Sequence, residues 1–287
     1  MRVHLVDGTF ELFRCFHGAP RARSETGREV GAARGVLATL VALLHEPGVS
    51  HVAVAFDSVV APPGAARGGS AEDLIAAQAP LAADAVRALG LPVWPSGRYQ
   101  ADEVLATAAA RCAEHADVDQ VVICSTDKDF HQCVRCQRVV TLDRVRRVVT
   151  DEAAARLRYG VAPALLPDLF ALVGDRSDGI AGVPGWGAAS AAALLQRYGG
   201  LADIPLDPAR WEVPVRGASR LAAALAERRD EALLCRDLLE LRTDLPVRVD
   251  LDALAWHGAH RSRLTELCTT IEDTSVLERV ERWRPDS

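Results

Sequence analysis

The sequence has 287 residues, of which 49% are hydrophobic and 25% charged, with a net charge of −6. This composition is that of an ordinary folded protein and excludes a disordered or fibrous chain. No apolar run approaches the roughly 20 residues of a membrane span, the N-terminus lacks the layout of a signal peptide, and seven scattered cysteines do not form a disulfide framework, so we expect a cytoplasmic protein with no membrane partner.

Strand and helix patterns alternate in the first half of the chain. Apolar runs at 2–6 and 51–56 predict buried strands, and the helical spacing of apolar residues over 31–45 predicts a crossover helix between them. A loop at 58–70, a helix over 71–89, a short extended piece at 91–94, a helix over about 100–115 and a strand at 120–124 follow. Strands joined by crossover helices predict a mostly parallel sheet.

The second half of the chain has a different pattern. Residues 138–142 and 145–149 predict a hairpin or edge strands, and from residue 151 onward the spacing of apolar residues is mostly helical. We therefore expect an α/β domain over residues 1–150 and a helical region over residues 151–287. No flexible linker marks the boundary between them.

Carboxylates follow or open the predicted elements at several places. Three predicted strands are followed by aspartates, two acids open a predicted helix, and two more lie three residues apart in a Gly-rich turn. Because the carboxyl ends of parallel strands line one crevice, we expect these side chains to converge. The eight residues are Asp7, Asp57, Asp102, Glu103, Asp127, Asp129, Asp175 and Asp178.

A pocket with that many like charges is stable only when cations neutralise it. All the expected ligands are oxygen atoms, which favours Mg²⁺ or Mn²⁺ over zinc, and two such ions suit hydrolysis of a phosphodiester. Each acid alone also has an ordinary explanation, as a helix cap, a solvated first-turn residue or part of a turn. Convergence is favoured because three strands rarely end in carboxylates by chance.

Four blocks of sequence in this order resemble the bacterial 5′-to-3′ exonuclease and flap endonuclease family, which includes the 5′ nuclease domain of DNA polymerase I. The blocks are Leu5 to Gly8, Tyr99 to Thr107, Ser125 to Phe130 and Gly174 to Gly187. The resemblance implies a PIN-like α/β core, a C-terminal helix-hairpin-helix (H3TH) element, and two-metal hydrolysis of DNA. It implies catalytic roles for Asp7, Asp57, Asp102, Asp127, Asp129 and Lys128.

The last block carries a physical meaning of its own. Gly185 and Gly187 permit a tight turn before a helix predicted over 188–198, and backbone amides at such a turn can bind a phosphate. A plain connection between helices is the alternative. The resemblance implies that this element binds DNA at 5′ ends, flaps, nicks or branches, and that the protein is a monomer. The expected DNA-binding residues are Gly182, Val183, Gly185, Trp186, Gly187 and Arg67.

Two departures from the family pattern leave the function open. Gln100 stands where the family has a glutamate, and the segment 58–70 is short, with Arg67 as its sole basic residue. Lys128 either positions phosphate or balances the charge of its neighbours. The predicted function is an exonuclease or flap nuclease, the first alternative is a weakened paralogue that binds branched or nicked DNA, and a PIN-type ribonuclease is a third possibility.

Overall fold

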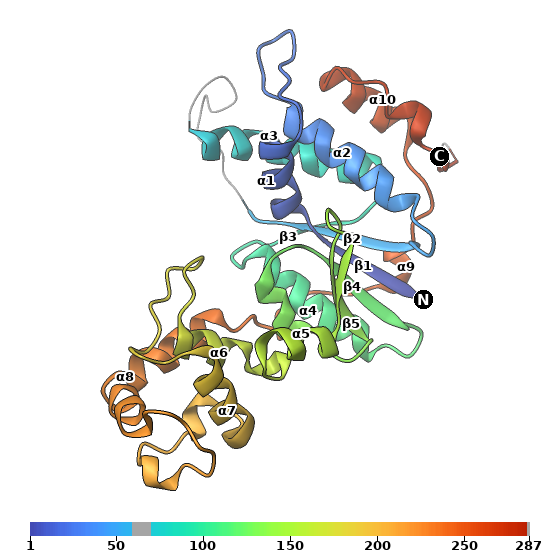
Figure 1. The fold of residues 1–287 in the computed structure, drawn as a ribbon. Helices are drawn as coiled ribbons and strands as arrows, with labels where there is room; N and C mark the ends of the chain where they lie inside the picture. The colour runs from blue at the N-terminus through green and yellow to red at the C-terminus, as the bar shows by residue number, and fades with distance from the viewer. Residues whose placement is uncertain (59–69, 286–287) are drawn as a thin grey trace. The chain divides into compact units, whose positions relative to one another are not determined.

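The computed structural model describes residues 1–58 and 70–285 (Figure 1). The chain forms two compact units, the first made of residues 1–125 and 243–287 and the second of residues 126–242. This division differs from a single boundary near residue 150. The C-terminal segment belongs to the first unit, because the indole nitrogen of Trp256 donates to the carbonyl of Leu89 at 2.8 Å and the amide of His260 donates to the carbonyl of Ala88 at 2.8 Å.

The first unit is built on a parallel sheet. Its four strands are β1 (Arg2–Asp7), β2 (His51–Phe56), β3 (Val93–Pro95) and β4 (Gln120–Cys124), in the order β3-β2-β1-β4. Strand β1 pairs with β2 on one side and with β4 on the other, and every pairing within this unit is parallel. The prediction of a mostly parallel sheet is confirmed. All these strands therefore end at the same edge, where Asp7 completes β1.

Helices cover both faces of this sheet (Figure 1). Helices α1 (Gly8–Gly18), α2 (Gly31–Leu44) and α3 (Ala71–Ala88) lie on one face, and α4 (Ala101–Glu114) lies on the other. The central strands are buried on both sides, which is why they read as continuous apolar runs. The short helix α9 (Leu251–Leu254), helix α10 (Arg261–Thr270), which packs on α3, and the 3₁₀ turn η6 (Leu277–Arg279) complete the unit.

The second unit begins with a 3₁₀ helix, η2 (Lys128–Cys133), and an antiparallel hairpin of β5 (Val139–Asp143) and β6 (Val148–Thr150). Helices α5 (Glu152–Tyr159), α6 (Leu166–Val173), α7 (Ala188–Tyr198) and α8 (Ala218–Leu239) follow. Three short 3₁₀ turns connect them: η3 (Pro163–Leu165), η4 (Leu201–Asp203) and η5 (Pro208–Arg210). Leu172, Leu194, Leu195 and Leu225 are fully buried at the centre of its core.

The predicted strands and helices are present with small shifts at their ends. Helix α1 was not predicted, although its buried residues Leu12, Cys15 and Phe16 recur at helical spacing, because its first turn directly follows β1. The predicted loop at 58–70 falls almost entirely outside the described residues. No helix in the described part of the chain is both long and apolar enough to cross a lipid bilayer.

Candidate metal centre

Two of the expected acids lie at the same edge of the parallel sheet. Asp7 ends β1 and is only 7% exposed; one of its oxygens accepts the amide of Phe10 at 2.9 Å and the other accepts the Ser125 hydroxyl at 3.1 Å. Asp57 follows β2, the neighbour of β1, and accepts the amide of Ala101 at 2.7 Å. Asp7 is thus both the N-cap of α1 and a carboxylate at the sheet edge. Its role as a helix cap is therefore compatible with a role as a metal ligand.

The start of α4 adds two acids beside Asp57. Because Asp57 binds the first amide of α4, the next residue, Asp102, belongs to the same edge of the unit. Glu103 accepts the backbone amide of Gln100 at 3.1 Å, as a residue of a helix capping box does. Both acids are half-buried in the first turn of the helix, where the positive end of its dipole stabilises them.

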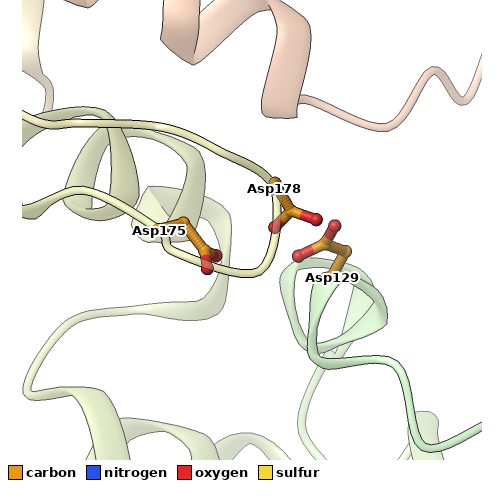
Figure 2. Close-up of side chains that lie close together, drawn as sticks. All are labelled: Asp129, Asp175 and Asp178. Carbon is orange, nitrogen blue, oxygen red and sulfur yellow. The ribbon is translucent and has the colours of Figure 1, made fainter.

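The second unit brings three carboxylates together. Oxygens of Asp129, Asp175 and Asp178 all lie within 4.8 Å of one another (Figure 2). Asp129 comes from η2, whereas the other two come from the loop that follows α6. Among the described residues, no other set of three His, Cys, Asp or Glu side chains is this close. Asp175 and Asp178, three residues apart in the Gly-rich turn, thus bring their carboxylates close to each other and to Asp129.

Local bonds hold the loop that carries Asp175 and Asp178. The backbone of Asp175 pairs with that of Ile180 through two hydrogen bonds of 2.8 Å, which closes the turn between them. The Ser177 hydroxyl and amide donate to the Asp175 carboxylate at 2.6 and 3.1 Å. Sequence reasoning did not assign roles to Ser125 or Ser177, although their place beside the acids in the Ser-Thr-Asp-Lys-Asp and Asp-Arg-Ser-Asp segments was a usable signal.

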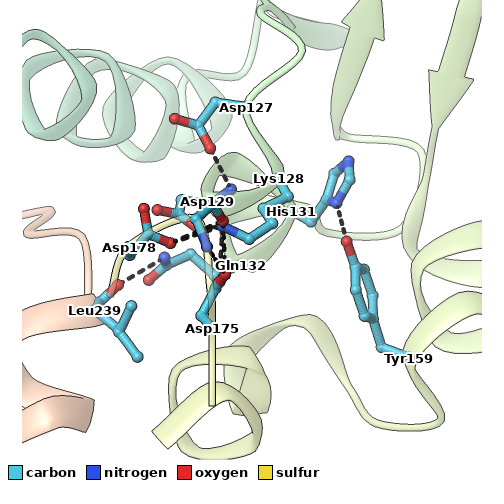
Figure 3. Close-up of polar contacts among 10 residues, drawn as sticks. Asp127, Lys128, Asp129, His131, Gln132, Tyr159, Asp175, Asp178 and Leu239 are labelled. Atoms are coloured by element: carbon cyan, nitrogen blue, oxygen red, sulfur yellow. Dashed lines mark hydrogen bonds and ion pairs between the residues drawn. The ribbon is translucent and has the colours of Figure 1, made fainter. Parts of the chain in front are cut away.

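Lys128 supplies the positive charge of this cluster (Figure 3). Its ammonium lies 2.7 Å from Asp175, 2.7 Å from Asp178 and 3.4 Å from Asp129. Burial lowers the pKa of Lys128, but the bonds to Asp175 and Asp178 outweigh it and raise the pKa well above its usual range. The charge-balancing role that the sequence left open is therefore the one that the geometry supports.

The pKa of Asp129 is shifted in the opposite sense to that of a paired acid. Burial and repulsion from Asp127 raise it to about 6, and the attraction of Lys128 only partly offsets this. Asp127 itself is exposed and accepts the Asp129 amide at 2.9 Å, which caps η2. The carboxylate of Asp129 is thus close to its charge-changing point near neutral pH, as is common for groups in functional sites.

Aromatic side chains of α5 and α6 contact η2. The His131 ring accepts from or donates to the Tyr159 hydroxyl at 2.8 Å, and Tyr159 packs edge-on against Phe170 at 5.8 Å between ring centroids. The ammonium of Lys128 lies 5.6 Å from the centre of the Phe170 ring. Burial, with help from the charges of Arg158 and Lys128, lowers the pKa of His131 to about 4, so this histidine is neutral at pH 7.

The turn between α6 and α7 contains all the residues expected to bind DNA except Arg67. The side chains of Val183 and Trp186 are buried, and their amides donate to Leu172 and Val183 within the unit, at 2.8 and 3.1 Å. Gly185 and Gly187 are the remaining candidates for contact with a phosphate. Gly182 has a structural role, because its φ is +72° and an added Cβ would lie 2.4 Å from the backbone of Gly174. Arg67 lies outside the described residues.

The structure brings three of the eight predicted carboxylates into one cluster. Those three are Asp129, Asp175 and Asp178, and the sheet edge of the first unit holds Asp7, Asp57, Asp102 and Glu103. That all eight share one pocket stays a prediction. Their donor chemistry is uniform, since every ligand atom is a carboxylate oxygen.

An α/β sheet with carboxylates at its strand ends, joined to a helical unit that carries a lysine-bridged trio of aspartates, is the architecture of a metal-dependent nuclease. The family model described as the 5′-3′ exonuclease N-terminal resolvase-like domain matches residues 2–160, and the one described as the 5′-3′ exonuclease C-terminal SAM fold matches residues 161–262. The chain belongs to the 5′-3′ exonuclease family, whose members hydrolyse DNA phosphodiesters.

Individual relatives agree with this assignment. The chain is similar to DNA polymerase I of Pseudomonas aeruginosa, with 35% identity over 96% of this chain and 31% of the relative, and to a 5′-3′ exonuclease of Aquifex aeolicus, with 26% identity over 98% of this chain and 95% of the relative. Its fold is similar to that of the zinc-bound T5 5′-exonuclease, with a TM-score of 0.66 and 18% identity. The match covers 95% of this chain and 98% of the T5 chain. The chain thus spans about a third of the DNA polymerase I relatives.

Proposed function

We propose that this chain is a divalent-metal-dependent 5′-to-3′ nuclease that cuts DNA at 5′ ends, flaps or nicks. The observation that carries the proposal is the trio of Asp129, Asp175 and Asp178, whose oxygens lie within 4.8 Å of one another and each contact the ammonium of Lys128. Three carboxylates around one cation have the donor chemistry that a hard divalent ion requires. The family membership supports the reaction class.

We propose two Mg²⁺ or Mn²⁺ ions, held by the carboxylates of both units. The ligands are Asp127, Asp129, Asp175 and Asp178 of the second unit and Asp7, Asp57, Asp102 and Glu103 of the first. When bound, such ions supply an activated water and stabilise the 3′ oxygen that leaves. The residues of the chain do the rest. Ser177 and Ser125 orient Asp175 and Asp7 by hydrogen bonds, and Lys128 holds η2 to the loop after α6 through its ion pairs.

The proposed DNA grip is the H3TH element formed by α6, the turn over 182–187 and α7. Gly187 caps α7, an eleven-residue helix whose N-terminal amides and dipole favour a phosphate. Binding through backbone amides is independent of base sequence, which suits an enzyme that recognises ends and branches. We retain residues 1–150 as the nuclease core and residues 151–287 as the DNA-binding region in this functional sense, and we propose a cytoplasmic monomer.

A weakened, DNA-binding paralogue is the second candidate. Gln100 is exposed at the start of α4, and its amide group is neutral where the family pattern has a carboxylate. An amide oxygen binds a hard cation more weakly than a carboxylate does. The loss of this charge next to Asp102 is the specific observation that favours the second candidate.

The two candidates are separated by cleavage assays on 5′-labelled overhang, flap and nicked duplexes in Mg²⁺ or Mn²⁺, with an RNA duplex beside them. We expect metal-dependent cleavage of DNA that the double variant Asp127→Asn, Asp129→Asn loses. Asp203→Asn, which alters an exposed acid of the same unit, is the matched control and keeps full activity. Binding of nicked DNA without cleavage in either metal would support the paralogue, and a preference for RNA would support a ribonuclease.

A further inference from the structure

Helix α8 is hydrogen-bonded near its start to the turn proposed to bind DNA and at its end to η2, which carries part of the acidic cluster. Near its start, the indole nitrogen of Trp186, in the turn before α7, donates to the carbonyl of Leu221 at 3.1 Å. At its end, the side chain of Gln132 makes two hydrogen bonds. Its amide nitrogen donates to the carbonyl of Leu239 at 3.0 Å, and its amide oxygen accepts the backbone amide of Leu241 at 2.9 Å.

Gln132 belongs to η2, the same short element that carries Lys128 and Asp129. Figure 3 shows its side chain reaching from η2 to Leu239, beside the acidic cluster. A single 3₁₀ element of six residues has few bonds of its own to fix its position. The ion pairs of Lys128 and the His131–Tyr159 bond tie η2 to the loop after α6 and to α5, and the two bonds of Gln132 tie it to the end of α8.

Helix α8 is the element that makes both contacts. Leu221 and Leu239 lie near opposite ends of its 22 residues, on either side of a kink. One residue, Arg228, departs from helical geometry, and next to it the guanidinium of Arg229 donates to the carbonyl of Ile204 at 3.1 Å. The helix is thus anchored at the kink as well, and its buried face packs against the core of the unit.

We propose that Gln132 is a positioning residue that couples the duplex-gripping turn to the metal cluster through α8. The inference rests on the proposed function. A phosphate held at Gly185 and Gly187 acts on Trp186 and α8, and Gln132 transmits the position of α8 to Asp129. Because coupling between two sites is reciprocal, duplex binding then strengthens metal binding, and metal binding strengthens duplex binding by the same factor.

The test measures that factor directly. The probe is a fluorescent dumbbell duplex with closed ends, which has no 5′ terminus to cut. Its dissociation constant is measured at constant ionic strength with EDTA and with saturating Mn²⁺, and the ratio of the two constants is the coupling factor. For the wild-type protein we expect about a fivefold ratio or more. Gln132→Met keeps the length of the side chain but removes both bonds, and we expect it to lower the ratio toward one while the affinity in EDTA stays within about twofold.

Two further variants complete the design. Gln196→Met removes a surface glutamine that donates to the carbonyl of Gly160 in the same unit, and we expect the wild-type ratio. Gln132→Glu keeps the acceptor for Leu241 but loses the donor to Leu239, so we expect an intermediate ratio, and it serves if Gln132→Met does not fold. A purely structural residue would change the melting temperature without changing the ratio.

A wild-type ratio of one, or an undiminished ratio in the Gln132 variants, overturns the inference. The proposed function fails in a different way. If the wild-type protein does not cleave a 5′-flap duplex in Mn²⁺, the nuclease proposal is wrong, whereas cleavage with no coupling leaves the nuclease proposal in place and removes only the role of Gln132.

Discussion

The ammonium of Lys128 lies 2.7 Å from a carboxylate oxygen of Asp175, and it is an equal distance from Asp178. Lys128 is the only lysine in the sequence, so no other side chain of its kind competes for this position. The contact joins η2 to the loop after α6, two segments that are far apart along the chain. One cation therefore contacts all three carboxylates of the acidic cluster and joins the two segments that carry them.

Lys128→Met should expose the repulsion among Asp129, Asp175 and Asp178. We expect the free energy of unfolding in EDTA to fall by about 1 to 3 kcal/mol, between the values for exposed and buried ion pairs, since the lysine is 25% exposed. The increase in melting temperature on adding Mn²⁺ should grow, because the ion then relieves the repulsion. Arg146→Met, which breaks an exposed pair with Asp143 in the same unit, should change neither quantity. Unchanged stability in EDTA for Lys128→Met would show that the pairs are not formed in solution.

Metal binding should weaken as the pH falls through 6. Burial and the charge of Asp127 raise the pKa of Asp129 to about 6, so below that pH a proton competes with the ion for its carboxylate. We expect the Mn²⁺ dissociation constant, measured by calorimetry, to rise by up to about tenfold per pH unit below 6. Asp127→Asn still caps η2 but removes the repulsion, so the change should begin at a lower pH. A metal affinity that is constant from pH 7 to 5 would contradict this prediction.

The stability of the second unit should also depend on His131. Its pKa is about 4 in the folded protein and 6.5 as a free side chain, so between these values the unfolded chain binds the proton more strongly. The stabilisation is complete above pH 6.5 and is lost as the pH falls toward 4, with a slope of up to about 1.4 kcal/mol per pH unit.

Chemical denaturation of the wild-type protein and of His131→Phe between pH 7 and 4.5 measures this contribution. The difference in unfolding free energy between the two proteins should shrink as the pH falls, because only the wild-type protein pays the proton-linked cost. The contribution of Asp129 to the free energy of unfolding changes over the same pH range in the opposite direction. Because both proteins contain Asp129, this contribution cancels in the difference between them. A difference that does not vary with pH would mean that His131 binds a proton as readily in the folded protein as in the unfolded chain, and would contradict this prediction.

Gly182→Ala should destabilise the turn proposed to grip DNA. The residue has a φ of +72°, and a Cβ there would lie 2.4 Å from the backbone nitrogen of Gly174, which cannot move aside cheaply. We expect a loss of about 2 to 5 kcal/mol in the free energy of unfolding, from the unfavourable conformation together with the clash. Gly18→Ala, at the end of α1 with no atom within 4 Å of its Cβ, should be neutral or slightly stabilising. Equal stability of the two variants would rule out this role for Gly182.

Local patterns in the sequence determined most of the elements and the family. Strands β1, β2 and β4 were predictable because they are apolar runs buried on both sides. Helix α7 was predictable from the Gly-rich block that precedes it and resembles the 5′ nuclease family. The chemistry of the acids was predictable as well, because strand ends and turns are where ligands of an α/β protein gather. Helix α1 was not predicted, since it begins at Gly8, directly after the last residue of β1.

Only the tertiary structure decided which groups meet. No pattern in the sequence places Lys128 between Asp175 and Asp178, or Gln132 against the end of α8, because such contacts join segments whose separation along the chain carries no information about their separation in space. The return of residues 243–287 to the first unit was hidden for the same reason. Periodicity reports the burial of one element at a time, whereas the pairing of charges depends on how buried elements pack together.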